Sequence, residues 1–230
     1  MAIQTYSYAK SDTYWTDMVT SINDNGIFDG YFDTVTENTT YISGTMHVTG
    51  IRFNIGDSVA MKIYANTNEM YNNHSFDIYI YTSNGAEYHF NYGGSGTHYI
   101  SKFTRTSNGV VINIATDKKK NDAIVVTKTD KGGIGFAVVQ YPDNVDADAP
   151  MYCISYDDSL SVAAESTNLP SLVQESNVTI LSHVACCDSP NGDYLPHCYL
   201  MRYSQQKGVQ RPFIMNDVTY ISNGYFCLEG

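Results

Sequence analysis

The sequence predicts an all-β protein, mainly an antiparallel sandwich or barrel, with one amphipathic helix near the N-terminus. Three observations support this fold class. Short runs of β-branched and aromatic residues recur from residue 27 onward, turn residues separate these runs, and a single stretch shows a helical period. Strands this short and this regularly spaced are typical of antiparallel sheets rather than of alternating β–α units.

Residues 76–92 give the clearest hairpin signal, because two strand-like runs flank Ser83-Asn84-Gly85. A two-residue turn would mix apolar and polar side chains on each face. A three-residue loop, with Gly85 in the left-handed conformation, separates a dry face from a wet face, so we predict this loop. The apolar pairs it creates are Ile78 with Phe90, Ile80 with Tyr88 and Phe76 with Tyr92.

The helical stretch runs from about Thr13 to Asn25. Ser11 or Asp12 can cap its start, and Gly26 stands where a helix commonly ends. We predict that its apolar stripe packs on the protein's own sheet; docking on a neighbouring subunit is the alternative. The stripe consists of Tyr14, Trp15, Met18, Val19 and Ile22.

The remaining elements follow from the same pattern. Residues 3 to 8 are expected as a short strand or an extended arm, and residues 155 to 175 as a loop carrying a short helix. A last hairpin, with a three-residue Ser222-Asn223-Gly224 loop, should pair Tyr220 with Phe226 and Val218 with Leu228. The other expected strands are 27–36, 40–48, 51–55, 58–65, 75–82, 86–92, 97–106, 110–116, 123–129, 134–140, 177–187, 194–203 and 209–215.

The chain divides into three predicted parts. Residues 1–26 form an N-terminal arm and helix, and residues 27–150 form the antiparallel sandwich. The acidic segment 141–150 contains two prolines and marks a boundary or a long loop. Residues 151–230 form hairpins that either complete the first sheet or make a second small β domain, and the sequence leaves both possibilities open.

Composition narrows the classes of partner. The formal net charge of −11 argues against binding to nucleic acid or to an anionic membrane surface. No apolar run is long enough to span a membrane and no secretory signal is visible, so we expect synthesis in the cytosol. The 20 tyrosines favour extensive contact surfaces, since tyrosine is enriched where proteins meet. Without a signal peptide, the five cysteines are expected to be free thiols.

The strongest candidate for a metal site is one cluster of histidines and cysteines; Asp143, Asp146 and Asp148 could offer oxygen ligands to calcium but lack the EF-hand spacing and are expected to form a solvated loop. His183, Cys186, His197 and Cys198 supply two thiols and two imidazoles, which is a competent zinc set. Their spacing matches no zinc-finger or ribbon pattern, and strand alternation places Cys186 on the face opposite His183. We therefore predict side chains packed in strands, with no metal and no cofactor.

Catalytic motifs are absent from the sequence. It has no Gly-x-Ser-x-Gly elbow, no phosphate-binding glycine loop and no His-Glu-x-x-His. We predict that the protein is not an enzyme. An enzyme would need an unrecognised site, for which the region around His183 and His197 is the first place to search.

The two ends of the chain are similar in sequence to a known class of proteins. The first end is Met1-Ala-Ile-Gln-Thr-Tyr-Ser-Tyr-Ala-Lys followed by Tyr14-Trp15, and the last is Phe213-Ile-Met-Asn-Asp-Val-Thr-Tyr-Ile-Ser-Asn-Gly-Tyr-Phe226. They resemble small structural proteins of tailed bacteriophages that infect Gram-positive bacteria. This resemblance implies a non-catalytic virion component of the neck, tail, baseplate or capsid surface. It also implies a symmetric oligomer that is built in the bacterial cytoplasm together with other virion proteins.

Two functional hypotheses follow. The first is a structural virion component whose contacts involve an N-terminal segment and exposed aromatic side chains in loops. The candidate interface residues are Ile3, Tyr6, Tyr8, Tyr71 and Tyr141. The second is a β-sandwich module that binds cell-surface carbohydrate through Tyr79 and Tyr81, on the wet face of the first hairpin.

Overall fold

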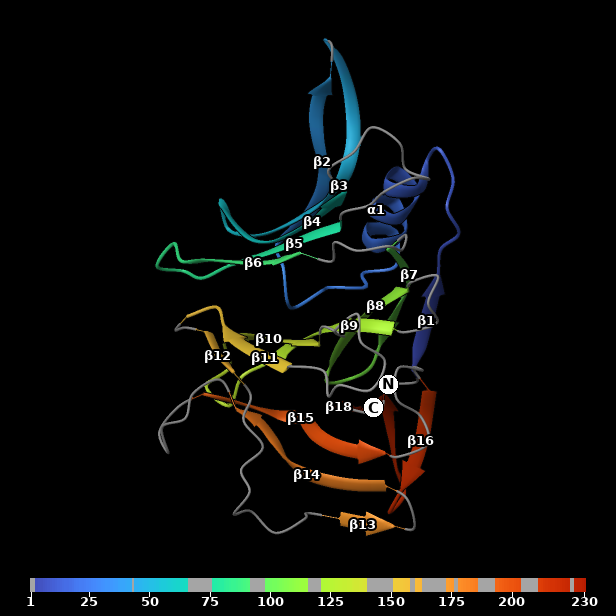
Figure 1. The fold of residues 1–230 in the computed structure, drawn as a ribbon, viewed down its shortest axis with the longest axis vertical. Coiled ribbons are helices and arrows are strands. Elements are labelled where there is room, and N and C mark those ends of the chain that lie inside the picture. Colours follow the sequence, from blue (N-terminus) through green and yellow to red (C-terminus); the bar gives the residue numbers. More distant parts are fainter. Residues whose placement is uncertain are drawn as a thin grey trace.

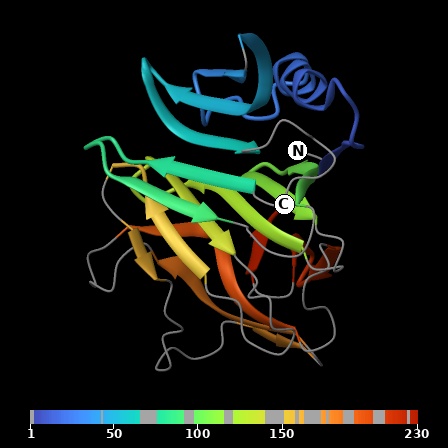
Figure 2. The same cartoon turned by 45° about the horizontal axis from the view of Figure 1, so that its top comes forward.

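A computed structural model confirms the all-β prediction: the described residues form strands in three antiparallel sheets and one helix, α1 (Tyr14–Asp24). The sheets stack as layers, with α1 beside the five-stranded sheet that contains β2 (Thr34–Ile42) and β3 (Thr45–Ile55) (Figures 1 and 2). The strand orders are open, so the architecture is sandwich-like rather than a closed barrel. The structure describes residues 3–42, 44–65, 76–91, 98–115, 121–139, 151–157, 160–162, 173–175, 178–185, 193–203, 211–223 and 226–230.

Each sheet has a simple order. The five-stranded sheet runs β2 (Thr34–Ile42), β3 (Thr45–Ile55), β4 (Ser58–Ala65), β5 (Phe76–Tyr81), β6 (Glu87–Asn91). The seven-stranded sheet runs β1 (Gln4–Ser7), β7 (Tyr99–Arg105), β8 (Gly109–Ala115), β9 (Asn121–Lys128), β10 (Ile134–Val139), β11 (Met151–Ser155), β12 (Leu160–Val162). The six-stranded sheet runs β13 (Val173–Glu175), β14 (Val178–Ala185), β15 (Tyr194–Tyr203), β18 (Phe226–Glu229), β17 (Val218–Ser222), β16 (Arg211–Met215).

The seven-stranded sheet is the middle layer and is buried on both faces. Along β8, Ile112 and Ile114 contact the core shared with α1 and the five-stranded sheet, whereas Val111 faces the six-stranded sheet. This explains why β10 is a continuous apolar run, and why β8 is buried along nearly its whole length with Asn113 as its one polar side chain. Two cores, one on each side of the middle sheet, therefore hold the three layers together.

The predictions for the first hairpin and the helix are confirmed. Ile78 pairs with Phe90 and Ile80 with Tyr88, and Gly85 closes the three-residue loop with φ of +84°. Tyr92, the predicted partner of Phe76, lies outside the described residues. The whole apolar stripe of α1 is buried against the protein's own sheets. The predicted cap was wrong, because Thr13 occupies the N-cap position and makes no side-chain capping bond.

Two early strand predictions were wrong in their limits. Residues 27–33 form turns, and their apolar side chains are buried in the core without belonging to a strand. The predicted strand 40–48 crosses the tip of the β2–β3 hairpin, where Ile42 pairs with Thr45 and Gly44 has φ of +82°. Apolar content alone did not distinguish buried turns from strands.

The register predicted for the last hairpin was also wrong. Ser222 pairs with Cys227 and Ile221 with Leu228, so the loop is one residue longer and the faces are exchanged. Both faces of this hairpin are apolar, because Ile221 and Leu228 face the core while Tyr220 and Cys227 face the outer side of the sheet. Alternation therefore could not choose the register.

The C-terminal part of the chain contributes to two layers. Residues 151–155 and 160–162 extend the middle sheet as β11 and β12, whereas β13 to β18 form the six-stranded sheet. Strands β12 and β13 lie inside the segment expected as a loop with a short helix. The expectation of five free thiols was wrong, because Cys153 is disulfide-bonded; Cys198 and Cys227 are free and buried.

Candidate interaction surfaces

The most prominent surface feature is an arm, defined as residues 39–48, in which β2 and β3 run on beyond the rest of their sheet (Figure 1). Strand β4 pairs with β3 only from Gly50 to Ile55, whereas the β2–β3 pairing continues to Ile42 and Thr45. The arm is therefore a two-stranded ribbon without further strands beside it among the described residues. A two-stranded ribbon has little stability of its own.

The base of the arm is shaped by a bulge. The register shifts between Asn38 and Thr39, which leaves Thr49 as an extra residue in β3. The Thr49 hydroxyl donates to the Asn38 carbonyl at 3.3 Å, and the Asn38 amide donates to the Thr49 hydroxyl at 3.4 Å. A Cβ atom on Gly50 would overlap the backbone of Ile63, so glycine is required where β3 bends.

The arm exposes an apolar pair near its tip. Tyr41 and Met46 are cross-strand partners, and they are 73% and 58% exposed. Because side chains alternate along a strand, Tyr41 lies on the same face of β2 as the buried Val35. Glu37 and Thr39 lie between them on this face, so the exposed apolar surface is the Tyr41–Met46 pair itself, which a partner could cover.

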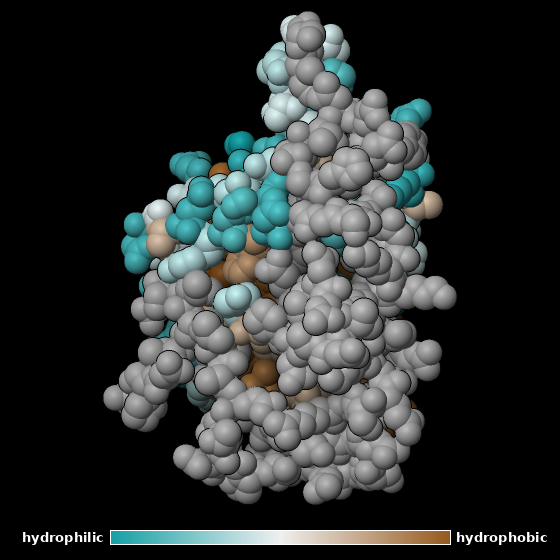
Figure 3. Space-filling model, in the orientation of Figure 1, coloured by the Kyte–Doolittle hydropathy of each residue, from teal (hydrophilic) through white to brown (hydrophobic). Residues whose placement is uncertain are grey.

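The arm also lacks the usual protection of exposed strands. Residues 38–50 contain no Asp, Glu, Lys, Arg or Pro, although the chain carries a net charge of −11. Charged residues and proline normally prevent exposed strands from associating. In the space-filling view, the described part of the tip is mostly pale, in contrast to the hydrophilic residues over the body beside it (Figure 3).

A second surface, the tyrosine face, lies on the side of the five-stranded sheet that points away from the middle layer. Its aromatic rings are nearly parallel: Tyr79 makes angles of 11° with Tyr64, 17° with Tyr81 and 8° with His89. The His89 ring stacks on Tyr79 with centroids 4.2 Å apart, and the Lys62 ammonium lies 5.6 Å from the Tyr79 centroid. Tyr79 is therefore already in contact with neighbouring side chains.

A buried carboxylate anchors the tyrosine face. Asp77 accepts a hydrogen bond from the Asn91 amide at 2.7 Å and lies 2.7 Å from Nε2 of His89. Burial raises the pKa of the Tyr64 phenol, and Tyr79 and Asp77 beside it add to the effect. Burial, followed by the Glu87 carboxylate, raises the pKa of Tyr81 to about 12. These phenols therefore stay protonated at neutral pH and can donate or accept hydrogen bonds.

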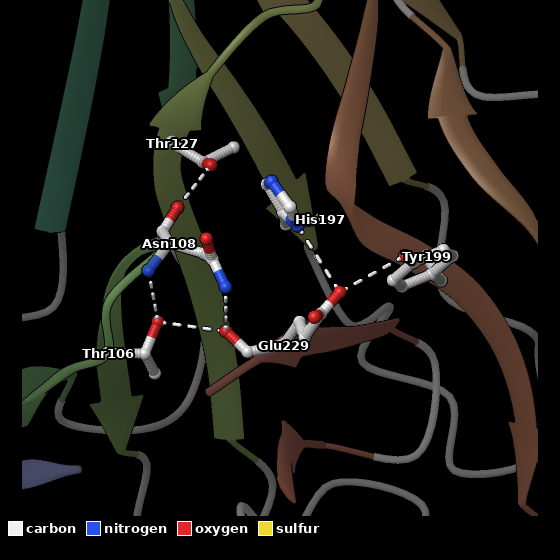
Figure 4. A network of polar contacts seen from close by, with 6 residues as sticks. All are labelled: Thr106, Asn108, Thr127, His197, Tyr199 and Glu229. Carbon is white, nitrogen blue, oxygen red and sulfur yellow. Dashed lines mark hydrogen bonds and ion pairs between the residues drawn. The ribbon is translucent and has the colours of Figure 1, made fainter. Parts of the chain in front are cut away.

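The C-terminal strand is locked to the middle layer by a polar network (Figure 4). The main-chain carbonyl of Glu229 accepts hydrogen bonds from the Thr106 hydroxyl at 3.0 Å and the Asn108 amide at 3.3 Å. Its carboxylate accepts from the Tyr199 hydroxyl at 3.3 Å and lies 3.2 Å from Nδ1 of His197. The network joins elements of two sheets, so its evident role is to hold the C-terminus in place.

The described residues do not bring together the zinc candidates that the sequence offered. Cys198 is buried between the sheets, and burial raises the pKa of its thiol well above the usual range. His183 stacks near Tyr199 with centroids 4.7 Å apart, and His197 contacts Glu229, so both imidazoles lie on the opposite side of β15. Cys186 lies outside the described residues. No group of three potential ligands occurs within the described part of the chain.

The predicted interface residues at the N-terminus are engaged within the chain. Strand β1 pairs with β7, and Tyr6 and Tyr8 pack against the core beneath α1. The Tyr8 hydroxyl donates to Ser21 at 2.9 Å, and Ile3 packs beside the C-terminus. Tyr71 and Tyr141 lie outside the described residues. The interface role of these five residues stays a prediction.

The arm was missed at the sequence level, although a signal was available. Residues 38–50 form an uncharged, Thr-rich segment around Ser43-Gly44, a dipeptide typical of turns. No protein-family model, no curated protein and no solved structure matches this chain. No helix among the described residues is long and apolar enough to cross a membrane.

Proposed function

We propose that the protein is a non-catalytic structural component of a tailed-bacteriophage virion, built in the cytoplasm of a bacterial host. The observation that supports this proposal best is the arm, a projecting ribbon with an exposed apolar pair. The resemblance of the two chain ends to small virion proteins points the same way. In this reading the arm joins the protein to its neighbours in the particle.

The physical properties of the arm suit an assembly contact. Tyrosine and methionine are enriched in the cores of protein interfaces, and Tyr41 and Met46 gain burial only when a partner covers them. A ribbon that is marginal alone is also stabilised by such a contact. The cost of leaving this surface open is therefore offset in the assembled particle.

Purified particles test this proposal. Particles from a host carrying the gene should contain the chain at a constant copy number, measured by quantitative mass spectrometry of density-purified material. The double variant Tyr41→Ser/Met46→Ser should stay soluble but be missing from particles. Tyr194→Ser, an exposed tyrosine on another sheet, is the control and should be incorporated normally. Absence of the wild-type chain from particles, or full incorporation of the arm variant, would contradict the proposal.

The tyrosine face supports a second candidate function, binding of cell-surface carbohydrate. It places three tyrosines beside Lys62 and the amide of Asn91, and sugars are bound by such combinations of aromatic and polar groups. Retention on immobilised cell-wall polysaccharide, lost in Tyr81→Ala and kept in Tyr41→Ala, would favour it. Failure of the wild-type protein to bind would remove this candidate.

A further inference from the structure

We infer that the partner of the arm is a second copy of this chain, and that the arm of one copy seats on the β16–β17 hairpin of the next. This inference rests on the proposed function and names the partner of the same surface. The association is head-to-tail, because the two contacting surfaces belong to different parts of the molecule.

The distribution of exposed apolar side chains supports this arrangement. Among the described residues, the large hydrophobic side chains that are exposed are Tyr41, Met46, Tyr194 and Ile214. The first two lie on the arm, at one end of the long axis, and Ile214 lies on β16, in the opposite half (Figure 1). Ile214 is 71% exposed, nearly as much as Tyr41 at 73%. Each end therefore presents apolar surface that the other end could cover.

The β16–β17 hairpin is built as a rigid platform. Its two-residue turn, Asn216-Asp217, has φ values of 50° and 63°, the geometry that matches the twist of paired strands. Phe213 and Tyr220 stack across the hairpin with centroids 5.1 Å apart. A rigid receiving surface lowers the entropy cost of association.

The contact is expected to use side chains rather than a continued β ladder. Strand β16 is the last strand of its sheet among the described residues, so one of its edges is open. Pro212 lies in this strand and has no N–H to donate, a common way to prevent edge-to-edge pairing. Tyr41 and Met46 would therefore pack against Ile214 and the exposed ring of Pro212.

Charge favours these two surfaces for contact between identical copies. Two chains of net charge −11 repel one another wherever acidic surfaces meet. The arm is uncharged over residues 38–50, and the hairpin 211–222 carries one arginine and one aspartate. Contact through these segments brings no net charge of like sign together.

A head-to-tail contact predicts a closed ring if the rotation between copies closes, and a filament if it does not. The experiment uses the full-length recombinant protein, analysed by light scattering after size exclusion and by native mass spectrometry over a range of concentrations. The wild-type protein should form oligomers. Tyr41→Ser/Met46→Ser and Ile214→Ser should each weaken association about tenfold or more, and Tyr194→Ser should not.

Mixing the two variants gives the decisive result. The arm variant keeps its receiving hairpin and the Ile214→Ser variant keeps its arm, so an equimolar mixture should form dimers that do not grow further. Thermal unfolding of each variant, close to that of the wild type, shows that folding is retained. A mixture that stays monomeric, or an Ile214→Ser variant that assembles like the wild type, overturns the inference.

The outcome is distinguishable from failure of the proposed function. If the wild-type protein is monomeric at all concentrations yet requires its arm to enter particles, the arm binds a different virion protein and only the inference is overturned. If the protein is monomeric and absent from particles, both are overturned.

Discussion

The substitution Tyr14→Phe tests how α1 is held against the sheets. Tyr14 is buried, and its hydroxyl donates a 2.6 Å hydrogen bond to the main-chain carbonyl of Ile100 in β7. Burial raises the pKa of this phenol well above its usual value, so the hydroxyl is protonated and can donate at neutral pH. The bond ties the helix, near the N-terminus, to the middle sheet.

The expected loss follows from the burial of this bond. Phenylalanine keeps the ring and its edge-on contact with Trp15 but leaves the Ile100 carbonyl without this donor. Losing one partner of a buried hydrogen bond costs about 1–2 kcal/mol. For a chain of 230 residues, each kcal/mol lowers the melting temperature by about 2–4 °C.

The matched control is Tyr41→Phe, which makes the same chemical change at an exposed position. Its effect on the free energy of unfolding should stay within about 0.5 kcal/mol. Both variants are measured by urea unfolding followed by circular dichroism. If Tyr14→Phe is no more destabilising than Tyr41→Phe, α1 is not held to the middle sheet by this bond and the packing described above is incorrect.

Three further predictions concern the cores, the phenols and the thiols. Gly135→Ala should lower the free energy of unfolding by about 1–3 kcal/mol in urea, because its Cβ would overlap Leu195 between two sheets. The double variant with Leu195→Ala should lose less than the sum of the two single variants, and strictly additive losses would contradict the contact. The free energy of unfolding should fall as the pH rises from about 10 to about 12, because the unfolded chain loses the Tyr81 proton from pH 10 while the folded chain keeps it. Tyr81→Phe should make this fall smaller. An unchanged dependence of the free energy on pH in Tyr81→Phe would refute the raised pKa of Tyr81. One disulfide among five cysteines leaves three thiols. Thiol titration in guanidinium should therefore count three thiols without reductant and five after reduction. Five thiols without reductant would show that Cys153 is not disulfide-bonded.

The elements that were predicted correctly from the sequence are those with one apolar face and one polar face. The hairpin from Phe76 to Asn91 has a single register that separates Ile78 and Ile80 from Asp77 and Tyr79, so its loop length was predictable. The helix was predictable for the same reason, since its stripe can face only one way. In both cases the amphipathic pattern allowed only one arrangement of the element against the core.

The errors occurred in segments that do not have one apolar and one polar face. The last hairpin is apolar on both faces, so the sequence could not choose between two registers. Phe28 and Phe32 are buried in turns, where Phe28 contacts both Phe53 and Phe103, although their segment has the composition of a strand. The turn at Ser43-Gly44 could have been read from the sequence, but that the hairpin projects beyond its sheet depends on where the pairing of β4 ends, which the residues 39–48 do not determine.

The most direct test of the arm as an assembly element is site-specific photo-crosslinking from position 41 in the recombinant protein. A photoreactive phenylalanine replaces Tyr41, and light and heavy isotope-labelled chains are mixed before irradiation so that contacts between copies can be recognised by mass spectrometry. We predict cross-links between position 41 of one copy and the segment 211–218 of another. Cross-links confined to the same chain, or no cross-links under conditions in which the protein is assembled, would contradict the account.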